Sequence, residues 1–134
     1  MANIHADRAR SLVGIRFRPQ GRAPEHGLDC VGLLLCAFDL PRDRVRSDYR
    51  LRGDYRAEIE QGLRECFRRI PKRWRRAGDV LLLAVAHDQL HLAIDSGEGF
   101  VHSDARLGRV VETPGAPPWQ ILGIYRRRCG KALG

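Results

Sequence analysis

The stretch that decides the fold is DCVGLLLCAFDLP, residues 29–41. Apolar residues fill it almost without interruption, so the helix that it predicts has no polar face and is expected to be buried. Asp29 is a natural N-cap residue, and Pro41 cannot continue a helix. The stretch therefore predicts a central buried helix that begins at Cys30.

Weaker helical patterns flank this segment. Residues Ile4–Val13 predict a short amphipathic helix, and Arg56–Ile70 predicts a surface helix with one apolar face. The segment 14–27 holds three Gly and two Pro and is expected to form a loop, while 41–55 is a charged connection.

The second half of the chain has an extended pattern. Gly, Pro and Asp separate the apolar runs there, which is typical of short strands joined by turns. Helices that precede a run of strands favour an α+β fold, with the helices packed on an antiparallel sheet. The predicted strands are Asp79–Ala86, Leu90–Asp95, Gly99–Ser103, Arg109–Glu112 and Ile121–Arg126.

Length and composition limit the class of protein. The chain has 134 residues with 43% apolar content, which fits a single globular domain over 1–134 and excludes a disordered chain. No apolar run approaches the ~20 residues of a membrane span. The N-terminus has no signal-peptide pattern, so we expect synthesis in the cytoplasm with reduced cysteines. Cys36, Cys66 and Cys129 are expected to be core residues.

Cys30 is a candidate nucleophile because it opens the predicted buried helix. The unpaired N–H groups and the dipole of a helix N-terminus favour negative charge, which predicts a lowered thiol pKa. The same N–H groups are suited to stabilise the oxyanion that forms when a thiolate attacks a carbonyl.

Two histidines flank a predicted hairpin turn at Gly97-Glu98. With a two-residue loop, Ala93 lies opposite His102, and His91 shares a face with His102 as its diagonal neighbour. The sequence thus permits a Cys30–His91–His102 relay of nucleophile, base and orienting group. Zinc would accept the same three residue types, but no fourth ligand or close ligand pair is evident, so neither metal nor cofactor is expected.

Three blocks resemble the NlpC-type cysteine peptidases, over most of the chain from Ala9 to Arg126. GLDCVGLL at 27–34 is similar to that family's Asp-Cys-Ser-Gly-Leu-Val motif. AGDVL at 77–81 is similar to its Pro-Gly-Asp-Leu strand start, and HLAID with GFVH (91–95 and 99–102) is similar to its His-Val-Gly-Ile-Tyr and Phe-Val-His hairpin. The order and spacing of the three blocks agree with the family.

The resemblance implies a papain-like fold and hydrolysis of amide bonds in peptidoglycan stem peptides. It implies Cys30 as nucleophile, His91 as base and His102 as the orienting residue, in the manner of short forms carried by phages and phage-like particles. Phe17 stands where the family often has a Tyr near the oxyanion or substrate, and Phe17 and Asp29 are the candidates for substrate contact. The alternative is a catalytically inactive papain-like module that binds wall polymer or a phage-tail partner.

The net positive charge of the chain raises the hypothesis of a polyanionic partner. The chain carries 24 Lys+Arg against 16 Asp+Glu, a net charge of +8, with a pI near 10.2. Such an excess attracts polyanions, including nucleic acid or cell wall. No helix-turn-helix, RRM, KH or zinc-finger signature is present, so a nucleic-acid partner is not favoured.

Overall fold

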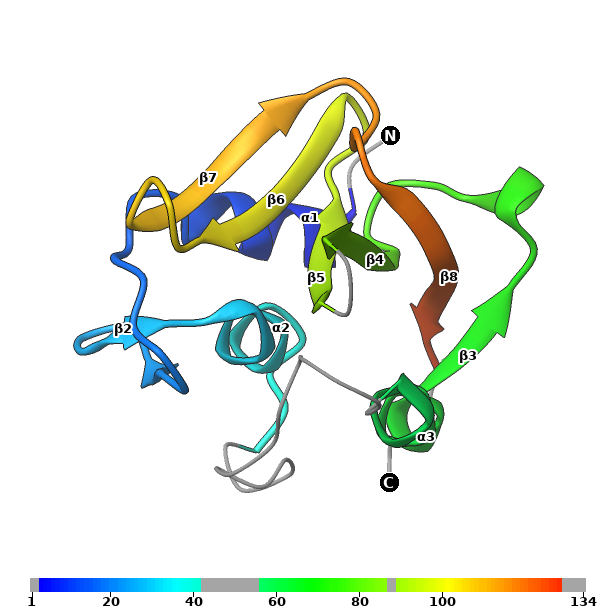
Figure 1. Ribbon diagram of the computed structural model, residues 1–134, viewed down its shortest axis with the longest axis horizontal. Helices are drawn as coiled ribbons and strands as arrows, with labels where there is room; N and C mark the ends of the chain where they lie inside the picture. The colour runs from blue at the N-terminus through cyan, green and yellow to red at the C-terminus, as the bar shows by residue number, and fades with distance from the viewer. Residues whose placement is uncertain (1–2, 42–55, 87–88, 129–134) are drawn as a thin grey trace.

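The protein folds around a six-stranded antiparallel sheet, seen in a computed structural model that describes residues 3–41, 56–86 and 89–128 (Figure 1). The order of the strands across the sheet is β3-β8-β4-β5-β6-β7. Consecutive strands from β4 to β7 are neighbours, and β8 returns to lie between β3 and β4. The strands are β3 (Phe67–Ile70), β4 (Val80–Ala86), β5 (Gln89–Asp95), β6 (Gly99–Asp104), β7 (Arg109–Pro114) and β8 (Gln120–Arg127).

Three helices pack on one face of this sheet. They are α1 (Ile4–Ser11), α2 (Cys30–Ala37) and α3 (Arg56–Cys66), and each contributes to a single apolar cluster with the strands. A two-stranded hairpin, β1 (Arg22–Ala23) and β2 (Gly27–Leu28), leads into α2, and a short 3-10 turn, η2 (Lys72–Trp74), follows β3. The predicted α+β class with an antiparallel sheet is therefore confirmed.

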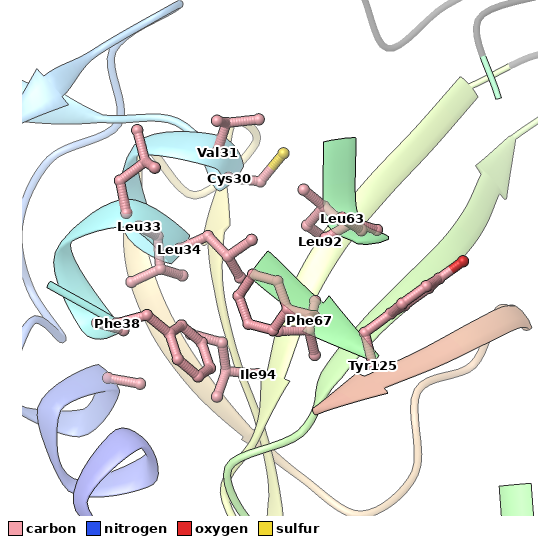
Figure 2. Close-up of a cluster of buried hydrophobic side chains, with 14 of the residues drawn as sticks. Cys30, Val31, Leu33, Leu34, Phe38, Leu63, Phe67, Leu92, Ile94 and Tyr125 are labelled. Atoms are coloured by element: carbon pink, nitrogen blue, oxygen red, sulfur yellow. The ribbon is translucent and has the colours of Figure 1, made fainter. Parts of the chain in front are cut away.

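The two faces of the sheet bury different side chains. Strand residues alternate between the faces, so Leu82 and Leu92 point toward the helices while Leu81 and Leu83 point away. The inner cluster, on the helix face, is shown in Figure 2 and includes Cys30. The outer cluster is smaller and comprises Ile70, Leu81, Leu83, Ala93, Phe100 and Ile124, with Val85, Trp119 and Ile121 packed against it.

One helix is shorter than predicted. The helix expected over Arg56–Ile70 ends at Cys66, and the last four residues form β3, an edge strand paired with β8. Phe67 belongs to the inner cluster and Ile70 to the outer one, which is the alternation of a strand and not of a helix. Tertiary pairing with β8 therefore overrides the helical periodicity of this segment.

The other elements agree with the sequence to within a few residues, although β1 and the start of β2 form inside the loop expected at 14–27. Residues 42–55 of the charged connection, together with His87 and Cys129, lie outside the described residues. In the part of the chain that the structure describes, no helix is long and apolar enough to cross a membrane.

Two helix glycines provide a matched pair of stability tests. A Cβ added at Gly32 would overlap the backbone oxygen of Gly21, whereas a Cβ at Gly62 in α3 would meet nothing within 4 Å. Gly32→Ala should therefore destabilise the fold by about 1–3 kcal/mol, because the hairpin that carries Gly21 must shift. Gly62→Ala should stabilise it by about 0.5–1 kcal/mol. Urea unfolding measures both free energies, and equal effects would contradict this packing of α2 against the hairpin.

Candidate active site

Cys30 is held at the first turn of α2 by a capped helix start. Asp29 Oδ1 accepts a hydrogen bond from the Gly32 N–H at 2.8 Å, and Asp29 Oδ2 accepts one from the Gln20 N–H at 3.1 Å. The predicted N-cap is confirmed in its geometry. The Cys30 residue is only 3% exposed, so the described state buries the thiol almost completely.

The two histidines meet across the β5–β6 hairpin. Ile94 pairs with Val101 and Asp95 with Phe100, and the Ser96 N–H donates to the Gly99 oxygen at 2.9 Å. This is the register that a two-residue turn at Gly97-Glu98 predicts. His91 Nε2 lies 2.8 Å from His102 Nδ1, so the imidazoles share a hydrogen bond.

The ladder between β5 and β6 stops beside this pair. The pairs between the two strands end at Ile94 and Val101, so from Ala93 and His102 onward β5 and β6 no longer pair with each other, although β5 stays paired with β4 and β6 with β7. We call this feature the β5–β6 opening. The Asp95 N–H donates toward β4, to the Asp79 oxygen. Because N–H groups alternate sides along an antiparallel strand, the Leu92 N–H points into the opening. There the Leu92 N–H lowers the pKa of the Cys30 thiol, because it favours the thiolate form.

The side chains of the three residues come from opposite faces of the sheet. His91 and His102 lie on the outer face, where their rings contact the Trp119 indole. Cys30 belongs to the inner cluster with Leu92. Within the described residues no hydrogen bond joins Cys30 to His91, so the structure pairs the histidines directly and brings the thiol beside the neighbouring backbone of Leu92.

A buried hydroxyl ties the two halves of this site together. Ser103 Oγ donates a hydrogen bond to the Leu28 oxygen at 2.7 Å, and thereby joins β6, next to His102, to the segment that leads into α2. Phe17 forms a parallel bridge with the same Leu28, so Phe17 also lies close to the start of α2. Sequence reasoning missed Ser103, whose only signal is its position directly after His102.

Comparison with solved structures identifies the architecture. The chain superposes with a TM-score of 0.59 on a lipoprotein-like protein of the NLP/P60 family from Staphylococcus aureus, at 20% identity, over 92% of this chain and 40% of that one. The fold is that of the NlpC/P60 domains. The chain thus spans less than half of the staphylococcal protein.

Two mycobacterial structures with the NlpC/P60 fold differ in activity. The peptidoglycan hydrolase RipB from Mycobacterium tuberculosis matches at 18% identity and a TM-score of 0.57, over 92% of this chain and 62% of that one. RipD, from the same organism, is a non-catalytic NlpC/p60 domain protein with an adaptation to peptidoglycan binding. It matches at 15% identity and a TM-score of 0.58, over 92% of this chain and 94% of that one. No family model and no curated protein sequence matches this chain.

The thiol pKa differs from the sequence prediction. Burial raises the pKa of Cys30 to about 12, and the negative charge of Asp29 acts in the same direction. Backbone N–H groups of Leu92, Cys30 and Val31 favour the thiolate but do not offset these effects. The expected lowering of the thiol pKa was therefore wrong for this state, because the desolvation of a buried charge exceeds the stabilisation by the helix N-terminus.

The histidine pair is also held neutral. Burial and, as a smaller effect, the charge of His102 together lower the pKa of His91 to about 4, against the opposing effect of Asp104. Burial likewise lowers the pKa of His102 against the effect of Asp104. In the NlpC/P60 fold of this chain, the resting site near neutral pH therefore consists of a thiol and two uncharged imidazoles.

Cysteine and histidine side chains are also metal ligands, and zinc was considered as an alternative for this site. Among the described residues, no group of three or more His, Cys, Asp or Glu is arranged to hold a metal ion. The zinc interpretation of Cys30, His91 and His102 is therefore not supported by the geometry.

Asp29→Asn should lower the pKa of the Cys30 thiol. The Asn side chain keeps an oxygen for the Gly32 N–H but removes the negative charge that helps to raise the thiol pKa. The pH dependence of iodoacetamide alkylation at Cys30, followed by mass spectrometry, measures this shift. Asp29→Ala is the control: it should lower the thiol pKa too, but also destabilise α2 by about 1 kcal/mol through loss of the cap. A thiol pKa that stays unchanged or rises in Asp29→Asn would contradict this electrostatic role.

Proposed function

We propose that this chain is an NlpC-type cysteine peptidase that hydrolyses amide bonds in peptidoglycan stem peptides. The observation that carries the proposal is the 2.8 Å hydrogen bond between His91 and His102 at the opening where Cys30 meets the Leu92 N–H. A nucleophile, a base and a group that orients the base are the parts that acyl transfer needs. In this proposal Cys30 attacks, His91 accepts and returns its proton, and His102 orients His91.

The proposed reaction requires one particular tautomer of each imidazole. To act as the base, His91 must keep Nδ1 free of a proton, so its Nε2–H donates to His102 Nδ1. His102 then carries its own proton on Nε2. This tautomer leaves His91 Nδ1 as the atom that takes the thiol proton.

The reaction proceeds in two balanced steps. Cys30 Sγ bonds to the amide carbon while its proton passes to His91. The backbone N–H groups of Cys30 and Val31, which favour negative charge on the sulfur, are the groups proposed to stabilise the oxyanion. The imidazolium gives this proton to the leaving nitrogen, the C–N bond breaks, and a thioester remains. His91 then removes a proton from water while the water oxygen bonds to the thioester carbon. The C–S bond breaks, the carboxyl product leaves, and His91 returns its proton to Cys30 Sγ.

The neutral resting pair makes proton transfer part of the attack itself. A thiol with a raised pKa beside an imidazole with a lowered pKa does not ionise spontaneously. Bound substrate therefore has to supply the stabilisation of the thiolate and oxyanion. This is general-base catalysis and not attack by a preformed thiolate.

The substrate proposal is supported by the activities of two proteins with this fold. RipB is a peptidoglycan hydrolase and RipD a peptidoglycan-binding protein, so both the hydrolytic and the non-catalytic use involve the wall. We further propose a short, phage-like form, made in the cytoplasm as one catalytic domain over 1–134 and delivered with a virion or phage-like particle, where tail proteins would be its partners.

The second candidate function is a non-catalytic module that binds wall polymer or a phage-tail partner. The burial of Cys30, its raised pKa and the Phe at position 17 favour this alternative. It predicts that muropeptides bind without being cleaved.

Cys30→Ala should abolish the cleavage of muropeptides while leaving the fold intact, because no other group replaces the nucleophile. Mass spectrometry of defined muropeptides measures the products. Cys36→Ala is the matched control, since it removes a thiol from the same helix and should retain activity. Cleavage by Cys30→Ala at the wild-type rate would exclude the mechanism, and wild-type protein that binds muropeptides intact would establish the non-catalytic alternative.

The pH profile of kcat/KM should be unusually broad on the acid side. His91 must be neutral to accept the thiol proton, and its pKa is lowered to about 4. Activity should therefore persist below the ordinary histidine range and fall only as His91 becomes protonated near pH 4. Initial rates across pH, with circular dichroism to confirm folding at each point, test this. An acid limb near the ordinary histidine pKa would show that burial does not control His91 in the active state.

A further inference from the structure

Trp119 forms the outer wall of the histidine pair. Its ring centroid lies 6.2 Å from that of His91 and 5.9 Å from that of His102, with interplanar angles of 80° and 66°. It also lies 6.0 Å from Phe100 at 74°. The indole therefore contacts three rings in edge-type arrangements, which aromatic pairs favour.

The position of Trp119 is fixed by the strands beside it. It directly precedes β8, where Gln120 pairs with Ala84 and Ile121 with Leu83, and Leu83 in turn pairs with His91. The indole thus extends from the start of β8 across β4 to the β5–β6 opening. Two prolines, Pro117 and Pro118, restrict the backbone just before it.

Apolar surroundings leave few charges near the imidazoles. On the outer face, β4 and β8 present Leu83 and Ile121, and Asp104 of β6 is the carboxylate that acts on both histidines. Trp119 is itself only half-buried, and the buried part of it includes its contacts with the two imidazoles. A side chain in this place excludes water from the pair and restricts the rotation of both rings.

We propose that Trp119 is a positioning residue, which shields the His91–His102 hydrogen bond and holds His91 in the orientation that the base requires. The proposal rests on the proposed peptidase function, but its physical part concerns the histidine pair alone. A hydrogen bond between neutral imidazoles is stronger where water cannot compete for its donor and acceptor. Removal of the indole should therefore loosen the pair without affecting Cys30 or the binding of distant parts of a substrate.

The first test is a titration of the histidine rings by NMR, which needs no activity. In Trp119→Ala, water reaches the pair and relieves the burial penalty on its charged form, so the pKa of His91 should rise by about one unit. Trp119→Phe keeps an apolar ring beside the pair and should raise the pKa of His91 by less. Trp74→Phe, which alters a 58% exposed indole, is the control and should change nothing. An unchanged His91 titration in Trp119→Ala overturns the proposal.

The second test separates positioning from substrate binding. Trp119→Ala should lower kcat for muropeptide cleavage about tenfold with KM nearly unchanged, because the base is misoriented in the bound complex. Trp119→Phe should recover most of this loss, and Trp74→Phe should match the wild type. A change in KM alone would show that Trp119 contacts substrate instead, and an unchanged kcat would also overturn the proposal. If the wild-type protein cleaves nothing, the proposed function fails, while the NMR titration still decides the role of Trp119.

Discussion

The geometry of the site depends on one buried hydrogen bond, from Ser103 Oγ to the Leu28 oxygen at 2.7 Å. It joins two parts of the chain that are far apart in sequence: the strand of His102 and the lead-in to Cys30. Both residues are at most 1% exposed, so an unmade bond would leave polar atoms without water and would cost more than the bond itself contributes. The bond therefore fixes the N-terminus of α2 next to β6, where the β5–β6 ladder ends. With α2 held there, the Leu92 N–H, which has no β6 partner, favours the thiolate form of Cys30 instead.

Burial dominates the electrostatics of this arrangement. A helix N-terminus contributes only partial charges, whereas complete desolvation of a thiolate removes its full hydration. For Cys30 the second effect is larger, and the adjacent Asp29 adds to it. Asp29, which caps α2 and so positions Cys30, thus also opposes ionisation of the Cys30 thiol. The histidines respond to the same burial in the opposite direction, since their charged form is the cation.

Local rules explain which features could be predicted from the sequence. The start of α2 follows from an Asp before an apolar run, and the β5–β6 register follows from a two-residue turn, so both were predicted correctly. The strand at Phe67–Ile70 could not be predicted, because its pairing partner β8 lies about sixty residues away. The same limit applied to Ser103 and Trp119, whose contacts are non-local. The catalytic roles of Cys30, His91 and His102 stay predictions, since the geometry of the described residues pairs the two histidines but shows no contact between either of them and the Cys30 thiol.

Three buried carboxylates have structural roles inside the fold. Asp79 is buried and forms a two-pronged ion pair with Arg126, at 2.8 and 2.9 Å, and Asp95 is buried against Arg75 at 3.0 Å. Asp29 is buried as the cap of α2. These carboxylates are used to hold strand ends and a helix start, so they contribute little to the potential outside the molecule. Exposed arginines such as Arg68 and Arg73 are left to set that potential. Because each of these two ion pairs neutralises an arginine as well as a carboxylate, the Lys and Arg residues outside them still exceed the remaining carboxylates by the net charge of +8. Such an excess attracts anionic polymers in general and selects none of them, so the charge by itself does not decide between a wall polymer and a nucleic acid.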